Sequence, residues 1–254
     1  MSEIIEIKNL LGKTLVGDFY CAKNNNKDKV VLLVHGFMAG RRWNGRLTKI
    51  AEELVENNIN VYSFDLSGYG ESDDENISIS SGILDVRCIL SYIRFQKFSK
   101  IGLLGHSLGG IISLEQSLDK VNSLCLLAPV TNKINYNFES RFGKPVMDSM
   151  RKNGFFDFKG SVSKGYREFF RVSLKIEEER INIISKEVLV DCKVPTLIIH
   201  GDCDDMIPVS DSENAIKFLS SESRLDIISG EGHLFDSSLD KVSLKVSDWF
   251  KETL

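Results

Sequence analysis

The chain has 254 residues, of which 42% are hydrophobic and 27% are charged, a length and balance typical of one globular α/β domain with a substantial core. Its formal net charge of −4 argues against binding to nucleic acid or to anionic lipid, because both need a basic surface. No apolar run approaches the roughly 18 residues that a transmembrane helix needs, so we expect no membrane span.

Strands and helices are predicted in alternation through most of the chain. Residues 4–8 and 14–21 predict an antiparallel hairpin. The continuous apolar run at 29–35 predicts a strand buried on both faces. The other predicted strands are 60–64, 100–104, 123–128, 194–200 and 224–228, and the predicted helices are 43–57, 83–95, 211–219 and 239–252. This alternation predicts an α/β fold, with a mostly parallel eight-stranded sheet and helices on both of its faces.

One long segment interrupts the alternation. Between Pro129 and Val194 the sequence predicts no strand of the main sheet, and this stretch holds seven of the 15 phenylalanines. A connection of this length is usually a lid or a small subdomain. We therefore expect an inserted cap over residues 131–190, with a helix at 171–190, on a core made of residues 1–130 and 191–254. Some of its phenylalanines should form a small core and others should contact the substrate.

The motif Gly105-His106-Ser107-Leu108-Gly109 lies between a predicted strand and a predicted helix. A serine at the apex of so sharp a turn has an exposed hydroxyl. A side chain at either flanking glycine would collide with the neighbouring strand or helix. The free N–H groups at the start of the helix would face negative charge that forms beside the serine Oγ. This is the layout of a nucleophile elbow, and it makes Ser107 the candidate nucleophile.

A serine hydroxyl is a weak nucleophile unless a histidine, oriented by a carboxylate, accepts its proton. His233 lies in a glycine-rich loop after the last predicted strand, where the catalytic groups of a parallel sheet gather. In the chain order Ser, Asp, His, the carboxylate should follow the strand at 194–200. Three aspartates compete there: Asp204 at the tip of the loop ranks first, Asp205 second and Asp202 third.

An oxyanion needs two N–H donors. We expect one from Leu108, directly after the serine, and one from Phe37, in the loop after the strand at 29–35. His35 in the same loop is interpreted as a structural residue that hydrogen-bonds to the backbone. Asp65 is expected to brace the loop that follows the strand at 60–64.

No metal or cofactor is expected. His200 and the three aspartates after it could chelate a cation, but nothing else in the chain supplies a matching distant ligand. The five cysteines form no CxxC pair and are odd in number, so they predict reduced thiols. Residues 1–6 are acidic and unlike a signal peptide. Together these features predict a cytoplasmic protein.

Taken together, the motifs resemble those of the α/β-hydrolases, and in particular the small cinnamoyl (feruloyl) esterases and monoacylglycerol lipases. The resemblance runs nearly end to end and rests on His35-Gly36, residues 64–72, the elbow, residues 201–208 and Gly232-His233. Ser67 departs from the pattern, because family members often have a structural arginine there.

The resemblance implies a serine esterase with Ser107 as nucleophile, Asp204 as acid, His233 as base, and Phe37 and Leu108 as oxyanion donors. The expected substrates are short- to medium-chain or aryl esters, hydroxycinnamoyl esters included, cleaved through an acyl-enzyme. A monoacylglycerol lipase, a thioesterase, a carbon–carbon bond hydrolase, and an amidase or peptidase are alternatives, because the fold and triad do not determine the substrate. A ligand-binding protein without catalysis is an alternative of another class. The oligomeric state stays open, a homodimer included.

Overall fold

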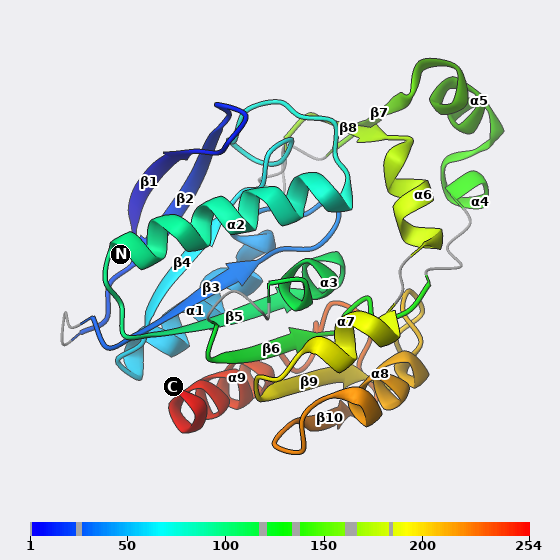
Figure 1. Ribbon diagram of the computed structural model, residues 1–254. Coiled ribbons are helices and arrows are strands. Elements are labelled where there is room, and N and C mark those ends of the chain that lie inside the picture. The colour runs from blue at the N-terminus through cyan, green and yellow to red at the C-terminus, as the bar shows by residue number, and fades with distance from the viewer. Residues whose placement is uncertain (1, 24–26, 117–120, 134–137, 161–166, 183–184) are drawn as a thin grey trace.

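The computed structural model describes residues 2–23, 27–116, 121–133, 138–160, 167–182 and 185–254 (Figure 1). Its centre is one eight-stranded sheet in the order β1-β2-β4-β3-β5-β6-β9-β10. The strands are β1 Glu3–Lys8, β2 Thr14–Tyr20, β3 Lys29–Val34, β4 Asn60–Phe64, β5 Lys100–His106, β6 Ser123–Leu127, β9 Thr196–Gly201 and β10 Arg224–Ile228. Strand β2 is antiparallel to both of its neighbours, and all other neighbouring pairs are parallel. This is the mostly parallel sheet that the sequence predicts.

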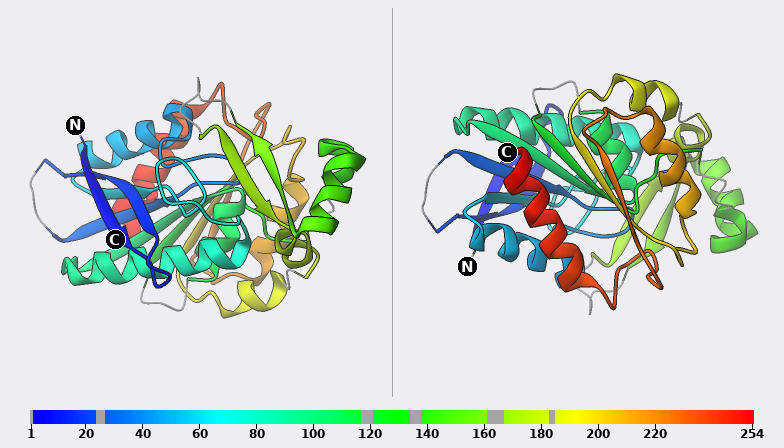
Figure 2. Two further views of the ribbon diagram at one scale, coloured as in Figure 1. Left: turned by 90° about the horizontal axis from the view of Figure 1, so that it is seen from above. Right: turned by 90° about the horizontal axis from the view of Figure 1, so that it is seen from below.

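Helices cover both faces of this sheet, as expected. One face carries α2 Ile79–Phe95, α3 Leu108–Leu114 and α8 Val209–Ala215, and the other carries α1 Arg46–Glu56 and α9 Leu239–Thr253 (Figure 2). Along β3, Val30, Leu32 and Val34 pack into one hydrophobic core, and Val31 and Leu33 pack into the other. Successive side chains of a strand point to opposite faces, which explains why this segment is apolar at nearly every position.

Two predicted helices differ from the sequence expectation at their first turn. The helix predicted from residue 43 begins as the 3-10 turn η1 Trp43–Gly45, in which Asn44 has a left-handed φ of 53°, so α1 starts only at Arg46. Helix α2 starts four residues before the predicted position because Ser78 and Ser81 form a capping box. A second 3-10 turn, η3 Ile216–Phe218, follows α8.

Residues 131–190, termed the insertion, hold a separate two-stranded sheet and four helices among the residues described. These elements are α4 Phe138–Phe142, α5 Lys144–Asn153, β7 Phe155–Lys159, β8 Phe169–Ser173, α6 Lys175–Ile181 and α7 Ser185–Asp191. Elements α4 to α6 lie beyond the carboxyl ends of the parallel strands, whereas α7 lies beside α8 (Figure 1). The helix predicted at 171–190 is wrong over residues 171–173, because these residues pair with β7. Helices α6 and α7 agree with the prediction over residues 175–181 and 185–190, and residues 183–184 lie outside those that the structure describes.

The insertion is anchored at the start of α2. The Ile77 N–H donates to the carbonyl oxygen of Arg171 at 2.8 Å, and the Ser173 N–H donates to the carbonyl oxygen of Ile77 at 3.0 Å. The Glu179 carboxylate on α6 accepts the N–H of Ile79 at 2.6 Å, in the first turn of α2. An anion at this position is favoured by the unpaired N–H groups of a helix N-terminus. These contacts hold the insertion beside the sheet edge where the parallel strands end.

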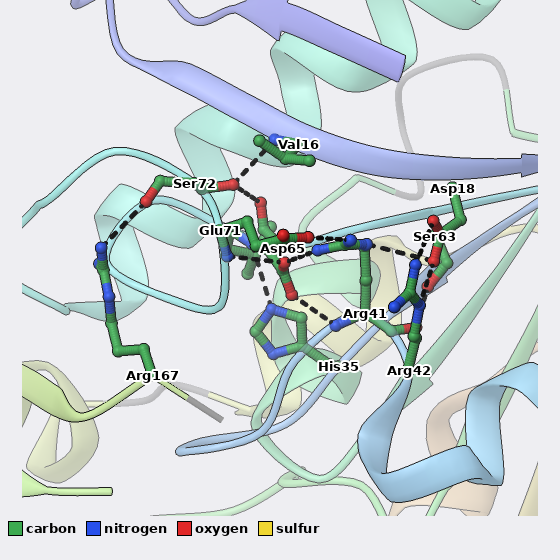
Figure 3. A network of polar contacts seen from close by, with 11 residues as sticks. Val16, Asp18, His35, Arg41, Arg42, Ser63, Asp65, Glu71, Ser72 and Arg167 are labelled. Atoms are coloured by element: carbon green, nitrogen blue, oxygen red, sulfur yellow. Dashed lines mark hydrogen bonds and ion pairs between the residues drawn. The ribbon is translucent and has the colours of Figure 1, made fainter. Parts of the chain in front are cut away.

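A buried ion network joins β2 to the loops that follow β3 and β4 (Figure 3). The Arg41 guanidinium donates to the carboxylates of Asp18, Asp65 and Glu71. The side chains of Arg41, Asp18 and Asp65 are 5%, 0% and 2% exposed, respectively. The carboxylate of Asp65 also accepts the backbone N–H groups of Arg41, at 2.7 Å, and Glu71, at 3.0 Å. Asp65 therefore braces its loop, as expected from the sequence, and also holds the loop after β3.

Replacement of Arg41 by methionine should lower the free energy of unfolding by about 3–5 kcal/mol, because it leaves buried carboxylates without their shared cation. Equilibrium unfolding in urea measures this change. Arg224→Met is the matched control, since it removes an exposed ion pair with Glu252 and should leave the urea midpoint near that of the wild type. Equal midpoints for the two variants would contradict the role assigned to the network.

Candidate active site

Ser107 lies at the junction of β5 and α3 in a strained backbone conformation, with φ 54° and ψ −116°. The glycines of the motif allow the approach that this turn needs. A Cβ atom on Gly105 would lie 2.3 Å from the carbonyl oxygen of Gly109, and one on Gly109 would lie 2.4 Å from the carbonyl oxygen of Val34. These are the collisions that the sequence predicts. The turn thus requires glycine at both positions to bring β5, α3 and β3 together.

Three backbone hydrogen bonds hold Ser107 in this conformation. Its N–H donates to the carbonyl oxygen of Leu127 at 2.9 Å, at the end of β6. Its carbonyl oxygen accepts the N–H groups of Gly110, at 2.9 Å, and Val130, at 3.0 Å. A non-glycine residue with positive φ persists only where its surroundings impose the conformation, and such residues concentrate at functional sites.

The Asp204 carboxylate is completely buried in the loop after β9 and accepts four hydrogen bonds. Its Oδ1 accepts the N–H groups of Met206 and Ile207, at 2.8 and 2.9 Å. Its Oδ2 lies 2.7 Å from Nδ1 of His233 and 3.1 Å from Nε2 of His200. Burial alone would raise the pKa of Asp204, but the hydrogen bonds from the two histidines and from Ile207 outweigh it and hold the pKa well below its usual range.

His200 is a partner of Asp204 that the sequence analysis did not assign. The ring is fully buried at the end of β9, with Nδ1 2.7 Å from the Ser212 hydroxyl. Its Nε2 faces two oxygen acceptors, on Asp204 and the Ile207 carbonyl, and therefore carries a proton. Since Asp204 accepts a hydrogen bond from each ring, Nδ1 of His233 is also protonated. Its Nε2 is then the basic nitrogen in the neutral ring.

His106 and Trp43 form a second support for His233 that the sequence did not reveal. The His106 ring stacks on Trp43 with centroids 3.8 Å apart, and its Nε2 lies 3.2 Å from the carbonyl oxygen of His233. This contact requires a proton on Nε2. Burial, and then the charge that His233 carries when protonated, lower the pKa of His106 well below its ordinary value. His106 thus stays neutral while it donates to the loop of His233.

The two expected oxyanion donors have free amides. Within the described residues, neither the Phe37 N–H nor the Leu108 N–H donates to another protein group, and both residues line the cavity that holds Ser107. His35 is buried, with Nδ1 2.9 Å from the carbonyl oxygen of Gly36 and Nε2 accepting the Leu66 N–H at 3.1 Å. Its expected structural role agrees with these contacts.

A cavity of about 670 Å³ opens over the elbow. Its lining includes Ser107 and His233 from the sheet side and Phe138, Phe158 and Phe170 from the insertion. Phenylalanines of the insertion also pack on one another, with the Phe142 ring 5.0 Å from that of Phe156 and 5.4 Å from that of Phe158. Phenylalanines of the insertion thus form a small core, as the sequence predicts, and others line the cavity, whereas Phe155 lies against Arg171 and Phe169 is 53% exposed. Contact with a substrate stays a prediction.

The structure brings the expected site residues to the same end of the sheet, but the expected contact between Ser107 and His233 is not formed. Among the described residues, the Ser107 hydroxyl has no hydrogen-bond partner, so it is not hydrogen-bonded to His233 although both line the cavity. Such contacts often tighten only when substrate is bound. Of the two lower-ranked aspartates, Asp205 is exposed and Asp202 accepts the N–H of Gly230 at 2.6 Å. The structure thus places Asp204, the first-ranked residue, against His233.

The described residues contain no group of three or more His, Cys, Asp or Glu side chains that could hold a metal ion. His200 and Asp204, which could be interpreted as cation ligands, are instead hydrogen-bonded to each other. Among the helices that the structure describes, none is long and apolar enough to cross a bilayer.

Comparison with known proteins identifies the family. Residues 31–242 match the model of the alpha/beta hydrolase family. A 2-hydroxy-6-oxo-6-(2'-aminophenyl)hexa-2,4-dienoic acid hydrolase of Metapseudomonas resinovorans is 25% identical over 219 residues, which cover 76% of this chain and 73% of that protein. A monoglyceride lipase homolog of Monkeypox virus is 24% identical over 240 residues, 85% of this chain and 86% of that protein.

Among solved structures, Est1E from Butyrivibrio proteoclasticus with bound ferulic acid is similar in fold. The TM-score is 0.78 at 20% sequence identity, and the match covers 98% of each chain. At this identity the likeness shows the shared fold and does not transfer a substrate.

Replacement of Asp204 by asparagine should remove a pH-dependent contribution to stability. Since the pKa of Asp204 is lowered by folding, its contribution is complete above the unfolded value of about 3.9 and is lost as the pH falls through the folded value. The difference in unfolding free energy between the wild type and Asp204→Asn should therefore be largest near neutral pH and shrink below about pH 4. Urea titrations across this range measure it.

The exposed neighbour provides the control for this experiment. Asp205→Asn should give little difference from the wild type at any of these pH values, because surface substitutions rarely change stability. A difference for Asp204→Asn that stayed constant with pH would show that the carboxylate is not stabilised in its ionised form.

Proposed function

The chain belongs to the α/β-hydrolase family, and we propose that it is a serine hydrolase that cleaves carboxylic esters through an acyl-enzyme. One observation carries the proposal. Ser107, in a strained turn, and His233, whose Nδ1 lies 2.7 Å from the buried Asp204 carboxylate, line the same cavity. A nucleophile, a base and a carboxylate that orients the base are the minimum set for this chemistry.

In the first step, Ser107 Oγ attacks the ester carbonyl carbon while Nε2 of His233 accepts the hydroxyl proton. The amides of Phe37 and Leu108 donate to the oxyanion that forms. Asp204 stabilises the imidazolium, and His233 returns the proton to the leaving alcohol. Water then attacks the acyl-enzyme by the same route and releases the acid. Closure of the gap between Ser107 and His233 on substrate binding is part of this proposal.

The insertion is proposed to act as a cap that shapes the substrate pocket. Phe138 from α4, Phe158 from β7 and Phe170 from β8 contribute apolar surface to the cavity. Apolar surface of this kind selects the apolar part of a ligand mainly by its shape. It supports short- to medium-chain alkyl or aryl acyl groups, hydroxycinnamoyl groups included.

Carbon–carbon bond hydrolysis is the second candidate. It is favoured by the relative from Metapseudomonas resinovorans, whose name describes hydrolysis of a hexa-2,4-dienoic acid. Monoacylglycerol hydrolysis is favoured by the viral lipase homolog. A panel of 4-nitrophenyl esters, methyl ferulate, a monoacylglycerol, an acyl thioester and a 6-oxo-dienoic acid separates these candidates by kcat/KM. A protein that only binds ligands would turn over none of them.

Ser107→Ala should lower kcat by about a millionfold and abolish labelling by a fluorophosphonate probe, because no other group can replace the attacking oxygen. Hydrolysis of a 4-nitrophenyl ester and gel fluorescence measure the two effects. Ser113→Ala is the control, since Ser113 lies on the same helix α3 and its buried hydroxyl has no hydrogen-bond partner within the described residues. Turnover near the wild-type rate by purified Ser107→Ala would refute the assignment.

Asp204→Asn should lower kcat by about four orders of magnitude, because an amide would favour the wrong tautomer of His233. The neighbouring variant Asp205→Asn should retain a rate near that of the wild type. The same ester assay measures both variants. If Asp205→Asn were the more damaging of the two, Asp205 would be the acid and the present assignment would fail.

A further inference from the structure

Three cationic side chains line the cavity over Ser107. Arg46 comes from α1, Lys159 from the end of β7 and Arg180 from the last turn of α6. Among the described lining residues, Asp236 supplies the one carboxylate. With the histidines neutral, three cations and one carboxylate give the lining a formal charge of +2, whereas the whole chain carries −4. The described lining residues therefore sum to a charge opposite in sign to that of the whole chain.

The surroundings of the three cations differ. Arg46 donates to the Asp236 carboxylate and to the carbonyl oxygen of Leu234 at the cavity rim. Lys159 is exposed and is hydrated by solvent. Arg180 is only 5% exposed, and its guanidinium carbon lies 4.2 Å from the centre of the Phe138 ring. Arg180 is thus the buried cation of the cavity.

A buried guanidinium is well suited to bind a carboxylate. Its planar N–H groups can donate two parallel hydrogen bonds, and such bonds are stronger where water is excluded. The Phe138 ring that lies against Arg180 also stacks near Phe37, with centroids 6.3 Å apart. Phe37 carries a proposed oxyanion donor. Phe138 therefore lies between the guanidinium and the loop that would hold the reacting carbonyl.

We propose that the natural substrate is an ester that also bears a carboxylate, and that Arg180 binds this carboxylate while Ser107 attacks the ester carbonyl. The inference rests on the proposed function and adds to it the charge of the substrate. Arg180 then contributes to specificity, because an uncharged ester of the same shape forgoes the paired hydrogen bonds.

The test compares anionic substrates with neutral ones of matched shape. Mono-4-nitrophenyl adipate and 4-nitrophenyl 5-carbamoylpentanoate place the carboxylate or its amide on the acyl side. The butanoyl esters of 4-hydroxybenzoate and 4-hydroxybenzamide place them on the alcohol side. In at least one pair, the kcat/KM of the wild type should be about 10-fold or more higher for the anionic substrate than for the neutral one. This difference is expected for charge-assisted hydrogen bonds. The pair that shows this preference tells whether the carboxylate lies on the acyl side or on the alcohol side of the ester.

Variants assign this preference to a residue. Arg180→Met should reduce the ratio between the anionic and the neutral substrate to about one. Arg151→Met is the matched control, because Arg151 is an exposed cation of the insertion, paired with Asp148 and Glu139, and is not among the cavity residues. It should keep the wild-type ratio. The preference should also persist in about 0.5 M salt, which would screen an exposed cation such as Lys159.

Each outcome decides a separate point. Turnover of both members of each pair with a ratio near one would overturn the anionic substrate while leaving the esterase proposal intact. Loss of the preference in Lys159→Met but not in Arg180→Met would overturn the role of Arg180. Absence of both turnover and fluorophosphonate labelling would instead refute the proposed function.

A second measurement uses the wild-type protein alone, so that it does not depend on the folding of Arg180→Met. Adipate should slow the labelling of Ser107 by the fluorophosphonate more than adipamide does at equal concentration. Equal protection by the two compounds would count against a carboxylate site.

Discussion

A carboxylate with no exposure to solvent is tolerated only when its oxygens are fully hydrogen-bonded, and Asp204 imposes this condition on the site. Its two backbone donors shape the loop after β9, and its two imidazole donors bring His200 and His233 to the same oxygen. The protonated nitrogens of both rings are consequently directed at Asp204. The basic nitrogen of His233 is determined by this burial, and not by any property of His233 alone.

The strained backbone conformations at the carboxyl ends of the strands must be stabilised by contacts with the rest of the structure. Met38, Ser107, Ala128 and Phe235 all have positive φ, and they follow β3, β5, β6 and β10, respectively. Each such residue costs free energy that the rest of the structure must offset. Around Ser107 the support is backbone hydrogen bonding, and behind the loop of Met38 it is the Arg41 network. The core thus stabilises backbone shapes that no short peptide would adopt.

Local patterns in the sequence predict the sheet and the elbow because their causes are local. Burial on both faces leaves an apolar run such as residues 29–34, and a tight turn leaves glycines at fixed positions. The order of serine, aspartate and histidine along the chain indicates which residues could contact one another. It does not give the distances and hydrogen bonds between them. The place of Asp204 in the loop ranks it above Asp205, and the contact of Asp204 with His233 agrees with that ranking.

The features that sequence reasoning missed depend on partners far apart in the chain. Arg41 meets Asp65 across 24 residues, and His106 meets His233 across 127. No periodicity records such contacts. His200 is the exception that the sequence could reveal, because it lies at the end of β9, four residues before Asp204 in the loop that follows. Residues 171–173 of strand β8 are predicted as helix because the five residues of the strand are too few to show alternation before the helical segment that follows.

In the proposed function, the core supplies the reacting groups and the insertion supplies the walls that select the substrate. Every residue of the proposed triad and both proposed oxyanion donors lie in the core, where burial and backbone geometry restrict substitution. The insertion instead supplies walls to the cavity, and its contacts with the core include backbone pairing at Ile77 and the Glu179 carboxylate at the start of α2. Backbone pairing does not depend on side-chain identity. The side chains that face the cavity can therefore vary while the anchor is kept, which is how one fold can serve relatives that act on different substrates.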